Sequence, residues 1–446
     1  MSGRISRRGF LTTASLALPL SAAVTSRAVA AATAAKPPAA AASPGYFDKG
    51  ARLTISMWDF SWLMAQYPGG AYAELERRVA EAKERGYNTL RVDCFPSRIL
   101  EAESRFEKNW DPAVDLPHWG QRATTFSCNV RQKVAQLAQF CRKHGVWLGL
   151  DCWDKGHMLS GAQDRLGGDD KKIAVADEER EFTRYGDIWV KALKLMREDG
   201  VLERAVWVAP MNEVPHFCGG HLSALAGLQN LPKNEGETKL TRSQQADAIY
   251  RRINHWMAEP IKAEIAKDKI PVSYSSLGAE DFGARLTDVY DVVDVHFMPG
   301  VIADADDQRE FAKAGKGAPG GRFAELQKYD LGAYSRAWDR ACRRHYGAML
   351  KRTHDYHQTA LQHLTLSSGK KLVPIITESF GPCFWPDHPQ VSWDWYKRYN
   401  ADSLRVVAAQ GFKGSSLSNY AEPIFSLWND ADWHWTSNTY FLEAGA

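Results

Sequence analysis

Two acidic residues stand at the ends of apolar runs and are the first candidates for chemistry. Asn212 and Glu213 follow an apolar run at residues 206–209, and Glu378 ends a second run at residues 373–377. Short runs of this kind are typical of strands that are covered on both faces. An isolated Asn-Glu pair is usually a surface feature, since acids are mostly exposed. Acids that end two buried parallel strands would instead meet at the carboxyl edge of the sheet, where such folds bind ligands.

Two carboxylates that face each other can hydrolyse a glycosidic bond. One protonates the leaving oxygen while the other attacks the anomeric carbon, and this retaining reaction requires the two groups to be about 5–5.5 Å apart. We therefore expect Glu213 and Glu378 to act as such a pair if the fold brings their strands together.

The elements that would position this pair alternate between strand and helix patterns. Strands are expected at residues 52–58, 88–93, 146–151, 206–209, 271–275, 292–297, 372–377 and 412–417. Helices are expected at 71–85, 129–144, 178–198, 241–267, 331–366 and 393–410. Three of these helices end at a glycine, as short connections to a following strand require. Eight strands separated by helices predict an α/β fold, a (β/α)8 TIM barrel with long βα loops; an open doubly wound sheet is the alternative.

Further polar and aromatic residues collect at the expected strand ends. The chain has 16 Trp, many of them outside apolar runs, and indole faces can stack on pyranose rings. The candidates for substrate binding are Trp58, Arg91, Asp151, Trp153, Asn212, His296, Trp385 and Asn419, together with Trp428 in the Trp-rich tail.

At these positions the chain resembles the glycoside hydrolases of clan A, in particular cellulase-like proteins near family 5. The resemblance covers residues 50–430 and rests on Asn212-Glu213 closing the fourth strand and Glu378 closing the seventh. It implies that Glu213 is the acid/base, that Asn212 binds the sugar 2-hydroxyl and that Glu378 is the nucleophile. It also implies that Arg91 keeps the nucleophile ionised, because a neighbouring cation lowers a carboxyl pKa, and that His296 lines the site.

Three departures from the family pattern bear on the substrate. Met298 stands where many relatives have a Tyr that bonds the nucleophile, and Trp153 stands where family 5 often has His. The eighth strand ends in Asn419 without the usual stacking Trp, so one of the tail residues Trp428, Trp433 and Trp435 is expected to take over that role. The prediction is a retaining hydrolase of β-glucan, β-mannan or related oligosaccharides. A non-catalytic sugar-binding protein and a transglycosylase that uses the same residues are the alternatives, and the oligomeric state stays open.

The N-terminus predicts export. Arg7 and Arg8 form a twin-arginine signature before an apolar stretch, and the small residues at 28–30 suit a cleavage site. We expect residues 1–30 to be a signal peptide, 31–47 a flexible leader and 48–446 a single catalytic domain in the periplasm or outside the cell. The apolar stretch is too short for a stable membrane anchor.

Charge and motif content argue against other classes. Removing residues 1–30 takes away four Arg and no acid, which changes the net charge from +3 to −1 and disfavours a nucleic-acid partner. The Gly-x-Gly-x-x-Gly at residues 315–320 opens no helix after a strand, so no dinucleotide cofactor is expected. Asp304, Asp306 and Asp307 are expected to form a solvated acidic turn, and His354 and His357 to lie on a surface helix, so no metal is expected. A disulfide between Cys218 and Cys383 is left open.

Overall fold

The computed structural model describes residues 47, 51–108, 122–153, 158, 177–213, 242–276, 286–298, 302–314, 330–381 and 387–444; for 242–249 it describes the backbone alone. The chain divides into two units, Met1–Ala39 and Ala40–Ala446, and all described residues belong to the second. The expected signal peptide, the leader apart from Phe47, and both cysteines of the candidate disulfide lie outside the described residues.

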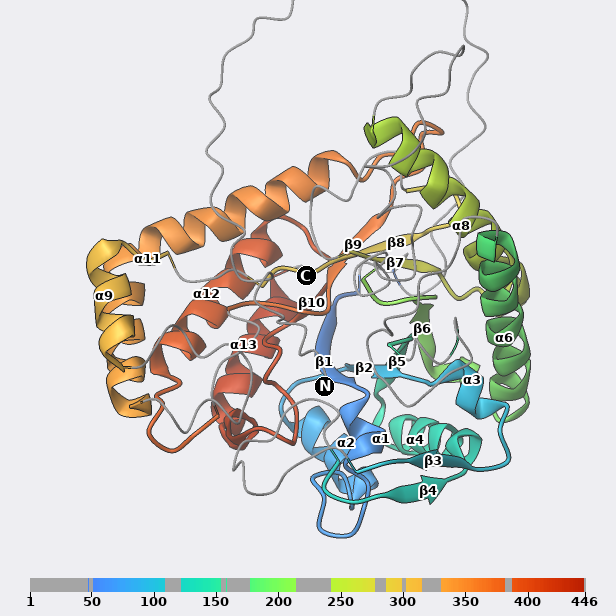
Figure 1. Ribbon diagram of the computed structural model, residues 1–446, viewed down its shortest axis with the longest axis horizontal. Coiled ribbons are helices and arrows are strands. Elements are labelled where there is room, and N and C mark those ends of the chain that lie inside the picture. Colours follow the sequence, from blue (N-terminus) through green and yellow to red (C-terminus); the bar gives the residue numbers. More distant parts are fainter. Residues whose placement is uncertain are drawn as a thin grey trace, which may run out of the picture. The chain divides into compact units, whose positions relative to one another are not determined.

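Eight parallel strands form one sheet that closes on itself (Figure 1). They are β1 (Leu53–Asp59), β2 (Thr89–Asp93), β5 (Trp147–Asp151), β6 (Ala205–Val208), β7 (Ser273–Ser276), β8 (Val292–Val295), β9 (Val373–Ile376) and β10 (Gly414–Ser416). Their order is β6-β5-β2-β1-β10-β9-β8-β7, and a parallel bridge between Val208 and Val272 joins the two ends. The Val208 amide donates to the carbonyl of Pro271 at 2.9 Å. The predicted (β/α)8 barrel is thereby confirmed, and the open sheet is excluded.

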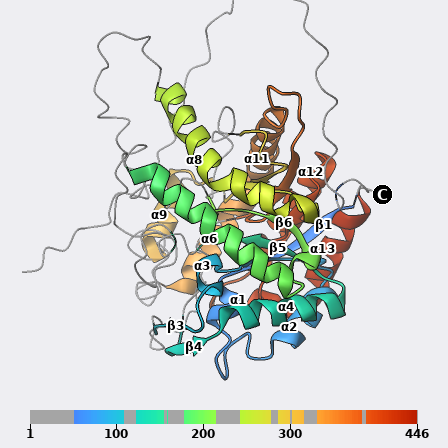
Figure 2. The same ribbon diagram turned by 90° about the vertical axis from the view of Figure 1, so that its right-hand side faces the viewer.

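Helices surround the barrel, as both ribbon views show (Figures 1 and 2). The longer ones are α2 (Leu75–Glu84), α4 (Val130–His144), α6 (Glu178–Glu198), α8 (Arg242–Ile265), α9 (Ala305–Ala314), α11 (Leu331–Gln362), α12 (Asp394–Ala409) and α13 (Ala431–Glu443). Helices α6 and α8 lie side by side on one flank. Short helices α1 (Ser61–Met64) and α3 (Pro96–Ile99) follow β1 and β2. Between β7 and β8 the described residues hold no helix.

Local sequence explains where several helices begin and end. The Asn129 side chain accepts a hydrogen bond from the Gln132 amide at 2.8 Å and caps α4, which stops at Gly145 with φ 67°. Gly86 and Gly200, with φ 80° and 72°, follow α2 and α6. A left-handed backbone is open to glycine at little cost, so each helix can turn back toward the next strand.

Three elements differ from the sequence prediction. Residues 305–314 form helix α9, which is not among the expected helices; the acidic residues around its first turn favour a helix start at the expected acidic turn. The loop after β2 contains a hairpin of β3 (Ser104–Phe106) and β4 (Phe126–Cys128). The Trp-rich tail forms α13, which Asp430 caps by accepting from the Trp433 amide at 3.2 Å.

The floor of the barrel is apolar and lies on the same face as the polar residues above it. Trp207 belongs to a buried cluster with Leu53, Ile55 and neighbours from β8 and β9. Gly149 pairs with Trp207 on one side and with Arg91 on the other, so these three residues share one face of the sheet. A methyl group on Gly149 would lie 1.9 Å from the Trp207 ring. Only glycine at 149 leaves room for this indole.

No helix among the described residues is long and apolar enough to cross a membrane.

Replacing Gly149 is expected to destabilise the barrel, because no side chain fits beside Trp207. Gly149→Ala forces the Trp207 ring to move within a packed core and should lower the free energy of unfolding by about 1–3 kcal/mol. Gly347→Ala is the matched control, because nothing lies within 4 Å of the added methyl group in helix α11. The control should be neutral or stabilising by up to about 1 kcal/mol. Urea unfolding curves of both variants measure the difference, and equal midpoints would contradict the packing argument.

Candidate active site

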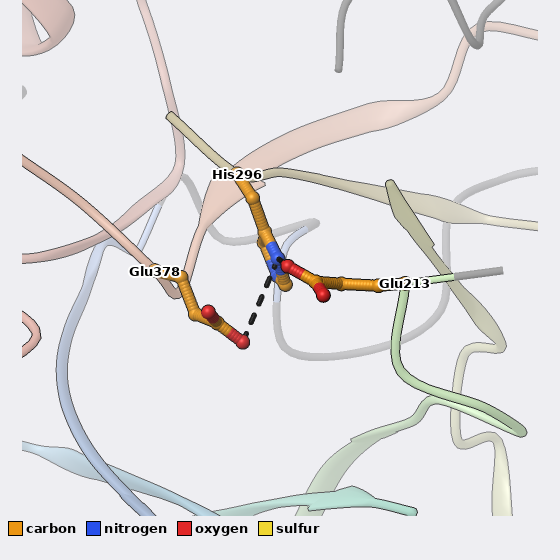
Figure 3. Close-up of side chains that lie close together, drawn as sticks. All are labelled: Glu213, His296 and Glu378. Carbon is orange, nitrogen blue, oxygen red and sulfur yellow. Dashed lines mark hydrogen bonds and ion pairs between the residues drawn. The ribbon is translucent and has the colours of Figure 1, made fainter. Parts of the chain in front are cut away.

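Glu213, His296 and Glu378 meet at the carboxyl ends of β6, β8 and β9 (Figure 3). One oxygen of each carboxylate and one ring nitrogen of the imidazole all lie within 4.8 Å of one another. The Nδ1 edge of the imidazole faces both carboxylates. All three side chains are buried. The two acids that the sequence places at the ends of separate strands are thus brought together.

Glu213 and the segment before it are held by bonds along two neighbouring strands, β5 and β7. The segment after β6 continues along β5, because the Ala209 amide donates to Leu150 and the Asn212 amide to Cys152. The Glu213 amide donates to the Ser275 hydroxyl of β7 at 3.1 Å. Glu213 itself has φ 50°, a left-handed conformation that costs a non-glycine residue about 1–2 kcal/mol. The surrounding bonds hold it there and turn its side chain toward Glu378.

Glu378 is fixed on both sides of its Cα. Its carbonyl accepts from the Phe297 amide at 3.0 Å, and the next amide, that of Ser379, donates to the Asn419 side chain at 2.6 Å. Its Oε1 accepts from Arg91 Nη1 at 2.8 Å and from Asn212 Nδ2 at 3.3 Å. Asn419 is thus placed behind this acid, where it holds the backbone.

Arg91 is the central cation of the site. Its guanidinium is fully buried and contacts Asp151 at 2.7 Å, Glu378 at 2.8 Å and Asp59 at 3.3 Å. It also donates to the side-chain oxygen Oδ1 of Asn212. Burial opposes the charge on Arg91, but the attraction of the three carboxylates exceeds this penalty and raises its pKa. Arg91 is therefore charged at every pH at which the protein folds.

His296 uses both ring nitrogens. Nδ1 lies 2.9 Å from Glu213 Oε1 and 3.5 Å from Glu378 Oε1, and Nε2 lies 3.1 Å from Asp294 Oδ2. Burial opposes protonation of the ring, but Glu378 and Asp294 outweigh it and raise the pKa of His296 well above its usual value. The raised pKa favours the imidazolium form of the ring.

Two acids at this site, Asp59 and Asp294, were not among the residues predicted from the sequence. Asp59 ends β1 with φ 36°, and Asp294 lies within the apolar run of β8. Burial raises the pKa of Asp59 despite the nearby Arg91. For Asp294 burial acts in the same direction, but His296 and Arg91 prevail and lower its pKa. An acid inside an otherwise apolar strand was the signal for Asp294.

The tryptophans are placed differently from one another. Trp153 is half-buried, and its Nε1 donates to Asp59 at 3.0 Å, so it remains beside the site. Trp58 is fully buried against Tyr72, which leaves no ring face for a sugar. Trp428 packs between Tyr87, stacked at 6.0 Å, and Arg85, 4.6 Å above its ring. The expectation that Trp58 and Trp428 stack on sugar is therefore corrected, because both are packing residues. Trp385 lies outside the described residues.

Asp151, the remaining predicted contact, is fully buried and turned toward Arg91. Burial raises its pKa, although the guanidinium and the Cys152 amide oppose this. It supports Arg91 from inside the barrel.

Within the part of the chain that the structure describes, two groups of side chains have the spacing of a cation site, namely Glu213–His296–Glu378 and Asp304–Asp307–His345. In the first, Arg91 and His296 already supply positive charge to the carboxylates. In the second, Arg344 contacts Asp304 at 2.9 Å and Asp307 at 3.2 Å. We assign no metal to either group.

The histidine pair of α11 is also not a metal site. His354 is exposed, as expected, whereas His357 is fully buried among Phe297, Phe380 and Phe412. Burial lowers the pKa of His357 to about 4. The expectation of a surface position is therefore wrong for His357, which is a neutral core residue.

Removing the buried cation should destabilise the fold in a pH-dependent way. Arg91→Leu leaves Asp59 and Asp151 buried without their counter-ion, which is expected to cost about 3–5 kcal/mol at pH 8. Without Arg91 the burial-raised pKa values of both acids rise further, so the folded state binds protons more readily than the unfolded chain as the pH falls. The loss should therefore be smaller at pH 5 than at pH 8, as measured by urea unfolding. Arg105→Leu, which removes an exposed ion pair with Glu107, should leave the stability nearly unchanged at either pH. A loss independent of pH would contradict the charge argument.

Comparison with known proteins agrees with this arrangement. The family described as "Cellulase-like: Sugar-binding cellulase-like" matches residues 55–441. No curated protein matches the sequence. Among solved structures, a candidate glycoside hydrolase from Parabacteroides distasonis shares 18% identity at a TM-score of 0.63, over 88% of this chain and 94% of that one. At this identity the likeness shows the shared fold.

Two more distant structures belong to glycoside hydrolase family 5. A mannosidase from Rhizomucor miehei has 12% identity and a TM-score of 0.40, over 89% of this chain and 94% of that one. A broad specificity endoglucanase from an uncultured bacterium has 12% identity and a TM-score of 0.46, over 82% and 84%. Neither is similar enough to carry an argument. The family match, in contrast, runs from β1 to α13 and spans every strand of the barrel, so this chain belongs to the cellulase-like family, which is described as sugar-binding.

Proposed function

We propose that this protein is a retaining glycoside hydrolase that cleaves β-linked glucose- or mannose-type sugars. The observation that carries the proposal is the pair of buried carboxylates, Glu213 and Glu378, at the ends of the fourth and seventh barrel strands. Membership of a sugar-binding family supports a carbohydrate substrate.

The separation of the two acids supports retention over inversion. Oxygens of Glu213 and Glu378 lie within 4.8 Å of each other. Retaining enzymes hold the carboxyl groups about 5–5.5 Å apart, whereas inverting enzymes need about 6.5–9.5 Å to admit a water. The separation in this chain is therefore closer to that of the retaining class.

Glu378 is assigned the role of nucleophile because two cationic side chains face it. Arg91 Nη1 at 2.8 Å and His296 Nδ1 at 3.5 Å favour its ionised form. A carboxylate oxygen of Glu378 would attack the anomeric carbon, and the bond to the glycosidic oxygen would break with its electron pair leaving on that oxygen. The product is a glycosyl ester of Glu378.

Glu213 is assigned the role of acid/base. It would give its proton to the departing oxygen and then, as a carboxylate, accept a proton from the water that attacks the anomeric carbon and releases the Glu378 carboxylate. Its side chain faces Glu378 because its backbone is held in the left-handed conformation. Asn212, the proposed contact of the 2-hydroxyl, donates to Glu378 from the same edge, and Trp153 is the described aromatic residue best placed to stack on a sugar.

A protein that binds sugar without turnover is the second candidate, and the family description favours it specifically. A glycan panel with mass-spectrometric products separates the two, since a binder retains glycans unchanged. Transglycosylation uses the same residues and would appear as lengthened products when sugar acceptors are added.

We also propose that the protein is exported by the twin-arginine pathway and acts in the periplasm or outside the cell. Arg7 and Arg8 before the apolar stretch support this. The N-terminal sequence of the protein recovered from the host would reveal cleavage near residue 30.

Removing either acid should impair hydrolysis in a characteristic way. Glu213→Ala should lower kcat on unactivated β-glycosides about 10²–10⁴-fold, but slow the first step little on dinitrophenyl β-glycosides, whose leaving group needs no proton. Azide should then restore turnover of the trapped ester and give a β-glycosyl azide. In Glu378→Ala, azide should replace the nucleophile and give the α-anomer. Steady-state rates and the anomeric configuration of the azide product are the measurements.

Asp355→Ala is the control for these variants, since Asp355 is an exposed acid on α11 paired only with Lys351 and His354. It should hydrolyse at the wild-type rate. Undiminished turnover in both Glu213→Ala and Glu378→Ala would end the assignment.

A further inference from the structure

Asp294 is a buried acid that touches His296 but neither of the proposed catalytic carboxylates. It lies within β8, and its Oδ2 is 3.1 Å from His296 Nε2. On the opposite side of the ring, Nδ1 faces Glu213 at 2.9 Å and Glu378 at 3.5 Å. The order across the site is therefore Asp294, imidazole and then the two carboxylates.

The orientation of Asp294 is fixed by the neighbouring strand β9. Its Oδ1 accepts from the Thr377 amide at 2.8 Å, and its Oδ2 accepts from the Thr377 hydroxyl. An amide N–H can only donate, so Oδ1 must be an acceptor. Both oxygens thus act as acceptors, which is how an ionised carboxylate bonds. His296 Nε2 must then carry a proton toward it.

We propose that Asp294 is a positioning residue that keeps His296 protonated on both nitrogens, making the imidazolium a cation shared by Glu213 and Glu378. This inference rests on the proposed function, because it assigns the two carboxylates their roles. The raised pKa of His296 and the lowered pKa of Asp294 agree with an imidazolium–carboxylate pair, which burial alone would disfavour.

A shared cation suits the movement of charge during the reaction. Before the first step Glu378 carries the negative charge and Glu213 holds a proton. When the glycosidic bond breaks, Glu213 loses its proton to the leaving oxygen and Glu378 becomes a neutral ester, so the negative charge moves from one acid to the other. Nδ1 of His296 lies within 3.5 Å of both. Its N–H can therefore bond whichever acid is ionised, with no change in the net charge of the site.

Other charged groups around the ring do not replace this arrangement. Arg91 contacts Glu378 and not Glu213, and Asp59 and Asp151 are bonded or paired to Arg91. The remaining neighbours of Nε2 are the hydroxyls of Ser275 at 3.4 Å and Thr377 at 3.3 Å. Asp294 alone among the described groups accepts the Nε2 proton as a carboxylate.

Asp294→Asn tests the proposal because the Thr377 amide dictates how the asparagine lies. The asparagine oxygen must accept from that amide, so its NH2 group faces His296 Nε2. Two donors cannot share this contact, and His296 must lose the Nε2 proton and become neutral. Glu213 and Glu378 then lose a cation at 2.9 and 3.5 Å, while the negative charge removed with Asp294 lies on the far side of the ring.

Both limbs of the pH profile of kcat/KM should consequently move upward in Asp294→Asn, by about 1–3 units if a contacting opposite charge is lost. The matched control is Asp151→Asn, another buried acid of the barrel interior that contacts Arg91 and not His296. This variant removes a negative charge and leaves Arg91 and His296 charged, so both limbs of its pH profile of kcat/KM should stay in place or move downward. A merely structural defect would lower the rate without this difference in sign. An unshifted or downward profile in Asp294→Asn would overturn the proposal.

A second measurement needs no turnover and therefore separates this proposal from the proposed function. In protein labelled with ¹⁵N-histidine, with His296 assigned by its absence in His296→Gln, wild type should show two protonated ring nitrogens at pH 7. Asp294→Asn should show one, at Nδ1. Two protonated nitrogens in the variant, or a neutral ring in wild type, would overturn the role of Asp294 even if the enzyme hydrolyses glycans. If the protein gives the expected spectra but hydrolyses no glycan, the role of Asp294 in keeping His296 protonated stands and only the proposed function is rejected.

Discussion

The site depends on burying a guanidinium among acids that would otherwise be uncharged. Arg91 is fully buried and contacts Asp59, Asp151 and Glu378. Burial costs several kcal/mol for each ion unless partners compensate, so no single pair of this cluster would be favourable alone. The closed barrel makes compensation possible, because strands β1, β2, β5 and β9 each deliver one member to the same point. The contact between Arg91 and Glu378 thus depends on the sheet bringing these strands together.

The apolar cluster around Trp207 closes the barrel below these charged residues, which are themselves buried. Trp207 lies on the same face as Arg91 and fits only because the residue between them in the sheet is Gly149. Above that floor the chain adopts left-handed backbone at Asp59, Phe95 and Glu213, which follow or end three barrel strands. Such conformations persist only where surrounding structure determines them, and they are concentrated at functional sites. The packing of Trp207 against Gly149 and the hydrogen bonds that hold the backbone at Glu213 together orient the acidic side chains toward the barrel interior.

The strands, the helix ends and the acids at the sheet edge can be predicted from the sequence, because each depends on a local pattern of residues. Apolar runs that end in Glu213 and Glu378 predict strands with acids at one edge, and glycines such as Gly145 and Gly200 predict where helices stop. Which tryptophans remain accessible could not be predicted in this way. Trp58 and Trp153 both stand near strand ends. Trp58 packs against Tyr72, whereas Trp153 donates to Asp59 of a different strand, and neither contact can be read from the residues next to the tryptophan. Exposure is a tertiary property that the sequence around each residue does not carry.

The departure at Met298 acquires a physical meaning from the same geometry. The family resemblance leads one to expect a tyrosine hydroxyl bonding the nucleophile at this position, and methionine cannot donate such a bond. In this chain Glu378 Oε1 is instead faced by Arg91, Asn212 and His296. If Glu378 is the nucleophile, as we propose, the absence of a tyrosine donor leaves its support to these three side chains, and His296 in turn contacts the acid behind it in β8. Asp294 contacts His296 Nε2 while Nδ1 faces Glu378, so in our proposal this buried acid contributes to the support that a tyrosine hydroxyl does not provide here.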